Sequence, residues 1–72
     1  MNQQSPETAI EAFQTAVKYK PDLTYAYIRW GQALGRLNRP KEAIEQLNQA
    51  LRLDPQNREA REMLEILKQF DK

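Results

Sequence analysis

The acidic residues are the candidates in this sequence for acid–base chemistry. Ten Asp and Glu residues are present, but the 72 residues contain no Cys and no His. Without these two residue types, no thiolate or imidazole is available as a nucleophile, general base or metal ligand. Two carboxylates can share acid and base roles, yet on helices this polar they more often lie solvated on an outer face. We therefore expect no enzyme, no catalytic residue, no cofactor and no metal site.

Charge and hydropathy narrow the class of partner. The formal net charge is +1, which gives no overall basic field for nucleic acid. No apolar run approaches the length of a membrane span, about 20 residues, and the first ten residues do not form a secretory leader. Gly31 and Gly35 are spaced as in a membrane-helix dimer, but Arg29 and Arg36 flank them, so Gly31 better fits a close helix crossing. These observations predict a soluble, cytoplasmic protein without a nucleic-acid or membrane partner.

Residues 24–57 are the segment around which the chain is organised. Two amphipathic helical patterns occur in it, separated by residues 38–40. Asn38 tolerates the left-handed conformation that ends a first helix, and Pro40 suits the first turn of a second. The apolar and small residues recur at three- and four-residue spacing, which predicts two helices that each bury one stripe and form an antiparallel hairpin. The stripes are Tyr27, Trp30, Gly31 and Leu34, and then Ala43, Ile44, Leu47, Ala50 and Leu51.

The segment before this hairpin repeats its second half. A shift of 34 residues places PETAIEAFQTAVKYKP, residues 6–21, on PKEAIEQLNQALRLDP, residues 40–55. Phe13 then aligns with Leu47. The first helix is therefore interpreted as the second half of a preceding, partial repeat.

The capping and turn residues of the sequence predict four helices joined by three short turns. Ser5 is expected to cap the first helix, and either Asp22 or Thr24 the second. We expect a tail over residues 1–4, the second helix of a partial repeat over 5–20, the full repeat over 24–57 and a terminal helix over 58–72.

Residues 24–57 resemble one repeat of the tetratricopeptide repeat (TPR) family, because their small and large residues fall at the offsets of that family. Gly31 occupies the small position and Pro55 the closing proline, while Tyr27 and Trp30 stand where the family usually has Trp and Leu. The resemblance implies an all-α fold of antiparallel helical hairpins, stacked as a short right-handed solenoid of about four helices. It also implies a protein-protein interaction module without catalysis.

The resemblance further implies a concave groove that binds an extended or helical peptide. Residues 18–41 contain six basic residues and one acidic residue, which favours an acidic peptide. The alternative is that the arginines of this segment only form exposed ion pairs with Glu59, Glu62 or Glu65. The Lys and Asn that clamp chaperone tails in some members are absent, so a chaperone tail is not expected. The candidate groove residues are Tyr25, Ile28, Arg29, Gln32 and Arg36.

The terminal helix carries a second apolar stripe that suggests a different kind of surface. Ala60, Leu64 and Leu67 are expected to pack onto the full repeat, whereas a stripe on the other side has no evident cover. The first helix is unbalanced in a similar way. A self-association surface is therefore a second hypothesis, in which the chain is a homodimer, or an excised or engineered fragment of a longer TPR array, with no dedicated ligand. The candidate residues are Met63, Ile66, Phe70, Ile10 and Val17.

Overall fold

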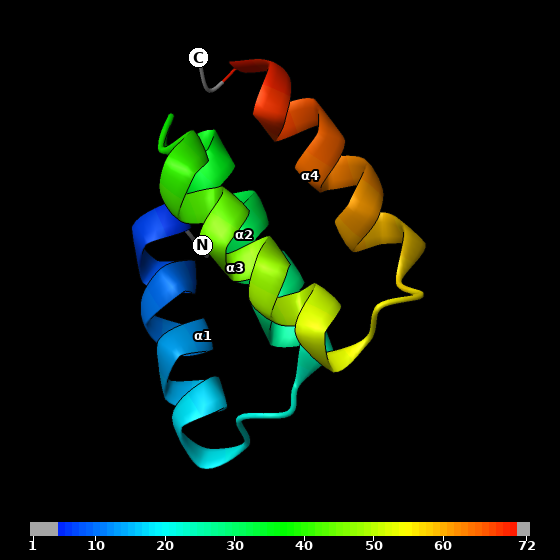
Figure 1. Ribbon diagram of the computed structural model, residues 1–72. Helices are drawn as coiled ribbons and strands as arrows, with labels where there is room; N and C mark the ends of the chain where they lie inside the picture. Colours follow the sequence, from blue (N-terminus) through cyan, green and yellow to red (C-terminus); the bar gives the residue numbers. More distant parts are fainter. Residues whose placement is uncertain (1–4, 71–72) are drawn as a thin grey trace.

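The computed structural model describes residues 5–70, and these residues form four helices without a strand. Consecutive helices run in opposite directions, so α2 and α3 form the predicted hairpin, with α1 against α2 and α4 against α3 (Figure 1). The fold class predicted from the sequence, antiparallel helical hairpins packed side by side, is confirmed. The expected tail over 1–4 and the last two residues of the terminal segment lie outside the described residues. The helices are α1 (Pro6–Tyr19), α2 (Thr24–Arg36), α3 (Pro40–Leu53) and α4 (Arg58–Phe70).

The helices repeat with the 34-residue period seen in the sequence. α1 and α3 each contain 14 residues and begin at prolines, Pro6 and Pro40, while α2 and α4 each contain 13 residues. Lys20 and Asp54, which follow α1 and α3, have nearly the same backbone angles, φ −136° and ψ 87° against φ −143° and ψ 83°. In both cases the backbone N–H donates to the carbonyl of an alanine four residues earlier. α1 and α3 are therefore the same structural unit placed twice.

Three of the helix ends are formed as the sequence predicts. The side-chain oxygen of Ser5 accepts a hydrogen bond from the backbone N–H of Thr8 at 3.3 Å, which satisfies one of the free donors at the start of α1. Asn38 has a φ of 62°, the left-handed conformation that ends the preceding helix. Pro40 then opens α3 at its first position, where a missing N–H costs nothing.

The start of α2 differs from the prediction. Leu23 occupies the capping position, and no side-chain hydrogen bond caps this helix, so the assignment of Asp22 or Thr24 as the cap is wrong. The carbonyl of Leu23 accepts the N–H groups of Ala26 and Tyr27 instead, at 3.0 and 3.4 Å. Backbone hydrogen bonds alone therefore close this end, and Leu23 itself is half-buried.

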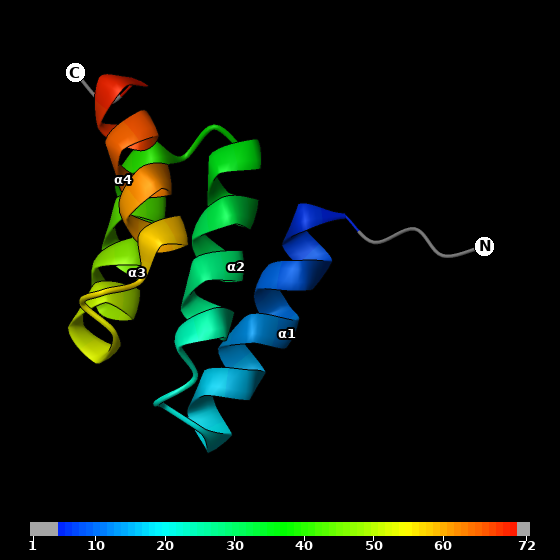
Figure 2. The ribbon, with the colours of Figure 1, turned by 90° about the vertical axis from the view of Figure 1, so that its right-hand side faces the viewer.

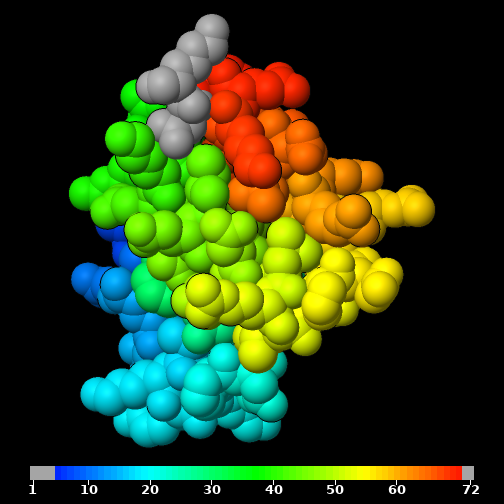
Figure 3. Space-filling view, viewed as in Figure 1, coloured from blue at the N-terminus to red at the C-terminus, as the bar shows by residue number. Residues whose placement is uncertain are grey.

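The core lies between α2, α3 and α4. Ala43, Leu47 and Ala50 of α3 are fully buried, and Ala60 and Leu64 of α4 are buried in the same region. The inner stripe predicted for the terminal helix is thus confirmed. Among residues 5–70, α1 contacts only α2 and buries no residue completely. α1 and α4 consequently lie at opposite ends of the row of helices (Figures 2 and 3).

The two glycines of α2 have different surroundings. A Cβ added at Gly31 would lie 3.0 Å from Leu47 Cγ and 3.2 Å from the carbonyl oxygen of Ala43, closer than side chains normally pack. Gly31 therefore permits the close crossing of α2 and α3, as the sequence indicated. A Cβ added at Gly35 would meet Leu67 Cδ2 at 3.5 Å, an ordinary contact. Gly35 faces a more open space between α2 and α4.

Candidate functional site

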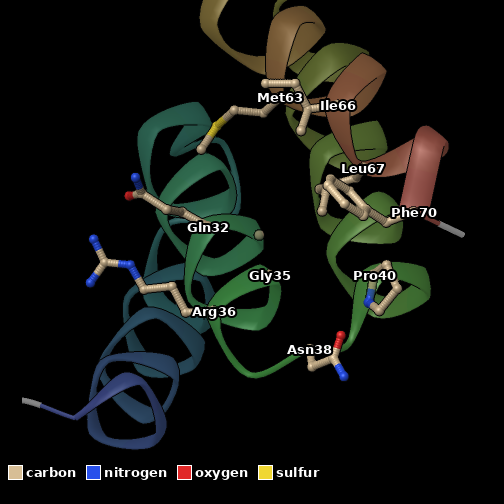
Figure 4. A pocket seen from close by; sticks show the side chains of 10 residues that line it. Gln32, Gly35, Arg36, Asn38, Pro40, Met63, Ile66, Leu67 and Phe70 are labelled. Carbon is tan, nitrogen blue, oxygen red and sulfur yellow. The ribbon is translucent and has the colours of Figure 1, made fainter.

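An open groove with a volume of about 430 Å³ lies between α2 and α4 (Figure 4). α2 and the turn after it form one wall, α4 forms the other, and Gly35 of α2 faces the space between them. Most of the lining surface is apolar. The volume is within the range of about 300–1,000 Å³ that is usual for ligand pockets. The lining residues are Gly31, Gln32, Gly35, Arg36, Asn38, Pro40, Met63, Ile66, Leu67 and Phe70.

The two walls come from equivalent positions of successive repeats but differ in chemistry. The 34-residue period places Met63, Ile66 and Phe70 of α4 on three positions of α2 that are all polar. These polar positions are Arg29, Gln32 and Arg36. Of these three, Gln32 and Arg36 line the groove and Arg29 does not, while the α4 side of the groove is apolar.

Arg29 is held by several contacts on the surface of α2. Its Nη1 atom lies 3.9 Å from Glu59 Oε2 of α4 and donates a hydrogen bond to Gln32 Oε1 at 3.1 Å. Its guanidinium carbon also lies 4.9 Å from the ring centre of Tyr25, a cation–π distance. The ion pair with Glu59 corresponds to the alternative interpretation of this arginine. Its side chain is about one-third exposed, so the pair contributes at most about 1 kcal/mol to stability.

Arg36 lies in the last turn of α2 and is exposed. Among residues 5–70, no carboxylate forms an ion pair with it. It lines the groove and also a smaller cavity of about 160 Å³ between α1 and α2, so it stands on the ridge between them. Figure 4 shows its side chain and that of Gln32 directed away from α4. The head group of Arg36 is therefore available to a group that lies across α2.

The apolar wall is supplied by α4. Phe70 is 72% exposed and Ile66 is 55% exposed, although both side chains are large and apolar. Met63 reaches across toward α2 above Gln32, and Leu67 lies against the floor near Gly35 (Figure 4). Sequence reasoning did not place these residues in the groove. The 34-residue shift that relates α1 to α3 also relates α2 to α4, and this shift is the signal that could have placed them there.

Ile28 does not belong to the groove, and its assignment as a groove residue is corrected here. It is only 3% exposed and packs in the core with Leu47 of α3 and Leu64 of α4. α2 contacts α1, α3 and α4, so its buried face is broader than the single stripe expected from the sequence. Of the other candidates, Tyr25 is 63% exposed beside Arg29. Gln32 and Arg36 line the groove itself.

The residues considered for self-association do not form one surface. Met63, Ile66 and Phe70 line the groove between α2 and α4. Ile10 and Val17 of α1 are half-buried and line clefts next to Trp30. Because α1 and α4 lie at opposite ends of the row of helices, the two groups are separate surfaces (Figure 2).

Trp30 is more open than the sequence suggested. It was expected to fill the core, but it is half-buried and borders two clefts between α1 and α3. Its ring stacks on Tyr27, with 6.2 Å between ring centres and 13° between planes. Because α1 and α3 do not contact each other within the described residues, part of the indole remains uncovered.

The described residues also bear on metal sites and membrane spans. Within residues 5–70, no group of three or more Asp or Glu side chains is placed to hold a metal ion. No helix in the same range is long and apolar enough to cross a membrane.

The fold and the groove define a helical-repeat protein with an open concave site. The sequence profile named "Tetratricopeptide repeat" matches residues 24–57, which comprise α2, α3 and the turn that follows. This segment is a tetratricopeptide repeat, and the chain carries it within an all-α array of four helices. No curated protein matches the chain. Tetratricopeptide repeats are generally protein-interaction modules, and the family is typically a non-catalytic scaffold.

Proposed function

We propose that this protein is a non-catalytic interaction module whose groove between α2 and α4 binds a segment of another protein, with a preference for acidic segments. The observation that carries the proposal is the exposed apolar wall of α4 in a groove that Arg36 of α2 also lines. Exposed large apolar side chains that gather at a concave surface are typical of interaction sites. The family supports the same kind of function.

The preference for acidic segments is supported by the distribution of charge. Residues 18–41 carry six basic residues against one acidic residue, and this segment includes the whole of α2. Arg36 is exposed on the ridge of the groove, where a carboxylate can approach it. Such an attraction is screened by salt over about 10 Å at 0.1 M ionic strength, so binding should weaken as salt is added.

Reversing the charge of the α2 wall tests the proposal. With Arg29→Glu and Arg36→Glu together, we expect binding of acidic peptides to be lost while the helical circular dichroism signal is kept, because both side chains lie at the surface. Binding is measured by fluorescence anisotropy of labelled acidic peptides. Unchanged binding would remove the groove hypothesis.

Self-association is the second candidate function, and one observation favours it. Phe70 and Ile66 leave an exposed apolar surface on α4 that a second copy could cover. Light scattering of a size-exclusion peak distinguishes the two functions. A dimer that becomes a monomer with Ile66→Asp and Phe70→Asp supports an interface at α4. A monomer before any substitution contradicts it.

A further inference from the structure

Arg29 and Arg36 of α2, of which only Arg36 lines the groove, differ in the contacts that they already make. Arg29 has an acidic partner in Glu59 and a second contact in Gln32. Arg36 has no acidic partner within residues 5–70 and is exposed. A carboxylate brought by a ligand therefore gains more at Arg36, because Arg29 would first have to give up Glu59.

Phe70 places an apolar surface in the groove that Arg36 also lines. It occupies in α4 the position that Arg36 occupies in α2, and Ile66 lies one turn before it. In Figure 4, Ile66, Leu67 and Phe70 lie on one side of the groove and Arg36 lies on the other. A ligand side chain that covers Phe70 and Ile66 removes exposed apolar area from water, which stabilises the complex.

Gly35 leaves room between these two walls. It precedes Arg36 and lines the groove, and Figure 4 shows it on α2 at the open space before α4. An added Cβ would touch only Leu67 Cδ2, at 3.5 Å. An alanine is therefore compatible with the free fold, but its methyl group would occupy space at the floor of the groove.

We propose that the groove is selective for an amphipathic segment that carries a large apolar side chain and a nearby carboxylate. The apolar side chain rests over Gly35 against Ile66 and Phe70, and the carboxylate pairs with Arg36. This inference rests on the proposed function, since it specifies the ligand of the same groove. Charge complementarity with Arg36, which lines the groove and has no acidic partner within residues 5–70, favours this occupant over a purely apolar one.

Fluorescein-labelled peptides of equal length test the selectivity. The parent peptide carries one Leu and one Glu a helical turn apart, and its variants replace Glu by Gln, Glu by Lys, or Leu by Ala. We expect Glu→Gln to weaken binding up to about fivefold, as for an exposed ion pair, and Glu→Lys to weaken it further. Leu→Ala should weaken binding about tenfold or more, because it removes the apolar contact.

Variants of the chain locate the two contacts. Arg36→Gln should abolish the difference between the Glu and Gln peptides, while Gly35→Ala and Phe70→Ala should weaken binding of the parent peptide. Arg52→Gln and Tyr19→Ala are the matched controls, since both residues are exposed and neither lines the groove. Both controls should leave binding unchanged. Circular dichroism checks that every variant keeps its helices.

The outcomes separate this inference from the proposed function. If Phe70→Ala weakens binding but the Glu, Gln and Lys peptides bind equally, the selectivity is wrong and the groove remains the binding site. The selectivity is also wrong if Arg36→Gln leaves the difference between the Glu and Gln peptides intact. If no peptide binds, or if binding is insensitive to every groove variant, the proposed function fails as well. A dimer in light scattering that the parent peptide does not dissociate, but that Ile66→Asp with Phe70→Asp converts to a monomer, assigns the groove to a second copy and overturns the inference.

Discussion

α1 and α3 are the same helix in two different surroundings. Both contain 14 residues, begin with proline and end in nearly the same backbone conformation. Nevertheless α3 buries Ala43, Leu47 and Ala50 completely, while their equivalents in α1 remain partly exposed. α3 lies between α2 and α4, whereas α1 contacts α2 alone within the described residues. The sequence of a repeat thus determines the helix and its apolar stripe, whereas the neighbouring helices determine how much of that stripe is buried.

The largest expected effect separates Leu47 from its equivalent, Phe13. Leu47→Ala should lower the free energy of unfolding by about 2–5 kcal/mol, because it empties a fully buried site. Phe13 is half-buried, so Phe13→Ala should cost less, about 1–2 kcal/mol. Urea denaturation followed by circular dichroism measures both. If Leu47→Ala does not fold, Leu47→Val replaces it. Equal losses at the two positions would contradict the comparison.

A smaller effect distinguishes the two sides of α2. Gly31→Ala should lower the free energy of unfolding by about 1–3 kcal/mol, because the new methyl group presses on Leu47 and on the backbone of Ala43. Gly35→Ala meets only an ordinary contact and should be neutral or stabilising by up to about 1 kcal/mol, since alanine favours a helix. Thermal unfolding of the two variants checks this. A reversed order would show that the close crossing lies on the α4 side.

The side-chain caps of α1 and α4 should also differ in their effect on stability. Asn57 Oδ1 accepts the N–H of Ala60 at 2.9 Å, and its side-chain nitrogen donates to Asp54. Asn57→Ala should therefore lower the free energy of unfolding by about 1 kcal/mol. Ser5→Ala removes a longer, exposed bond from α1 and should cost less, mainly as faster amide hydrogen exchange in the first turn. Loss of protection throughout the chain with Ser5→Ala would be inconsistent with a loosely attached α1.

The smallest effect concerns the ion pair between α2 and α4. Glu59→Gln should change the free energy of unfolding by less than about 1 kcal/mol, because both side chains of the pair are partly exposed and screened by water and salt. The same substitution releases Arg29, so we expect acidic peptides to bind slightly more tightly. Titrations at low and high salt measure both consequences. A large loss of stability would mean that this pair, and not the apolar contact, holds α4.

Much of the fold could be predicted because its signals are local. Pro6 and Pro40 mark helix starts, Asn38 supplies a left-handed end, and the apolar spacing identifies the helices. Gly31 could be assigned to the close crossing of two helices, because a small residue at this position of the repeat lets the helices approach each other. These features depend on a few neighbouring residues, so the sequence alone contains them.

The errors arise where several helices meet. Ile28 was assigned to the groove, yet it is buried because α2 is contacted from three directions. Leu23 stands in place of a polar cap, and its carbonyl accepts the first N–H groups of α2. Phe70 and its neighbours were considered for self-association, and only the register between α2 and α4 places them opposite Arg36 in one groove. Such features depend on the relative position of helices, which the pattern of one helix does not contain.

Mapping amide chemical-shift changes by NMR while the Leu- and Glu-containing peptide is added tests the central claim most directly. We expect the largest chemical-shift changes at Gly35, Arg36, Ile66 and Phe70, with little change on the exposed side of α3. Changes centred on Trp30 and Val17, in the cleft between α1 and α3, would contradict it.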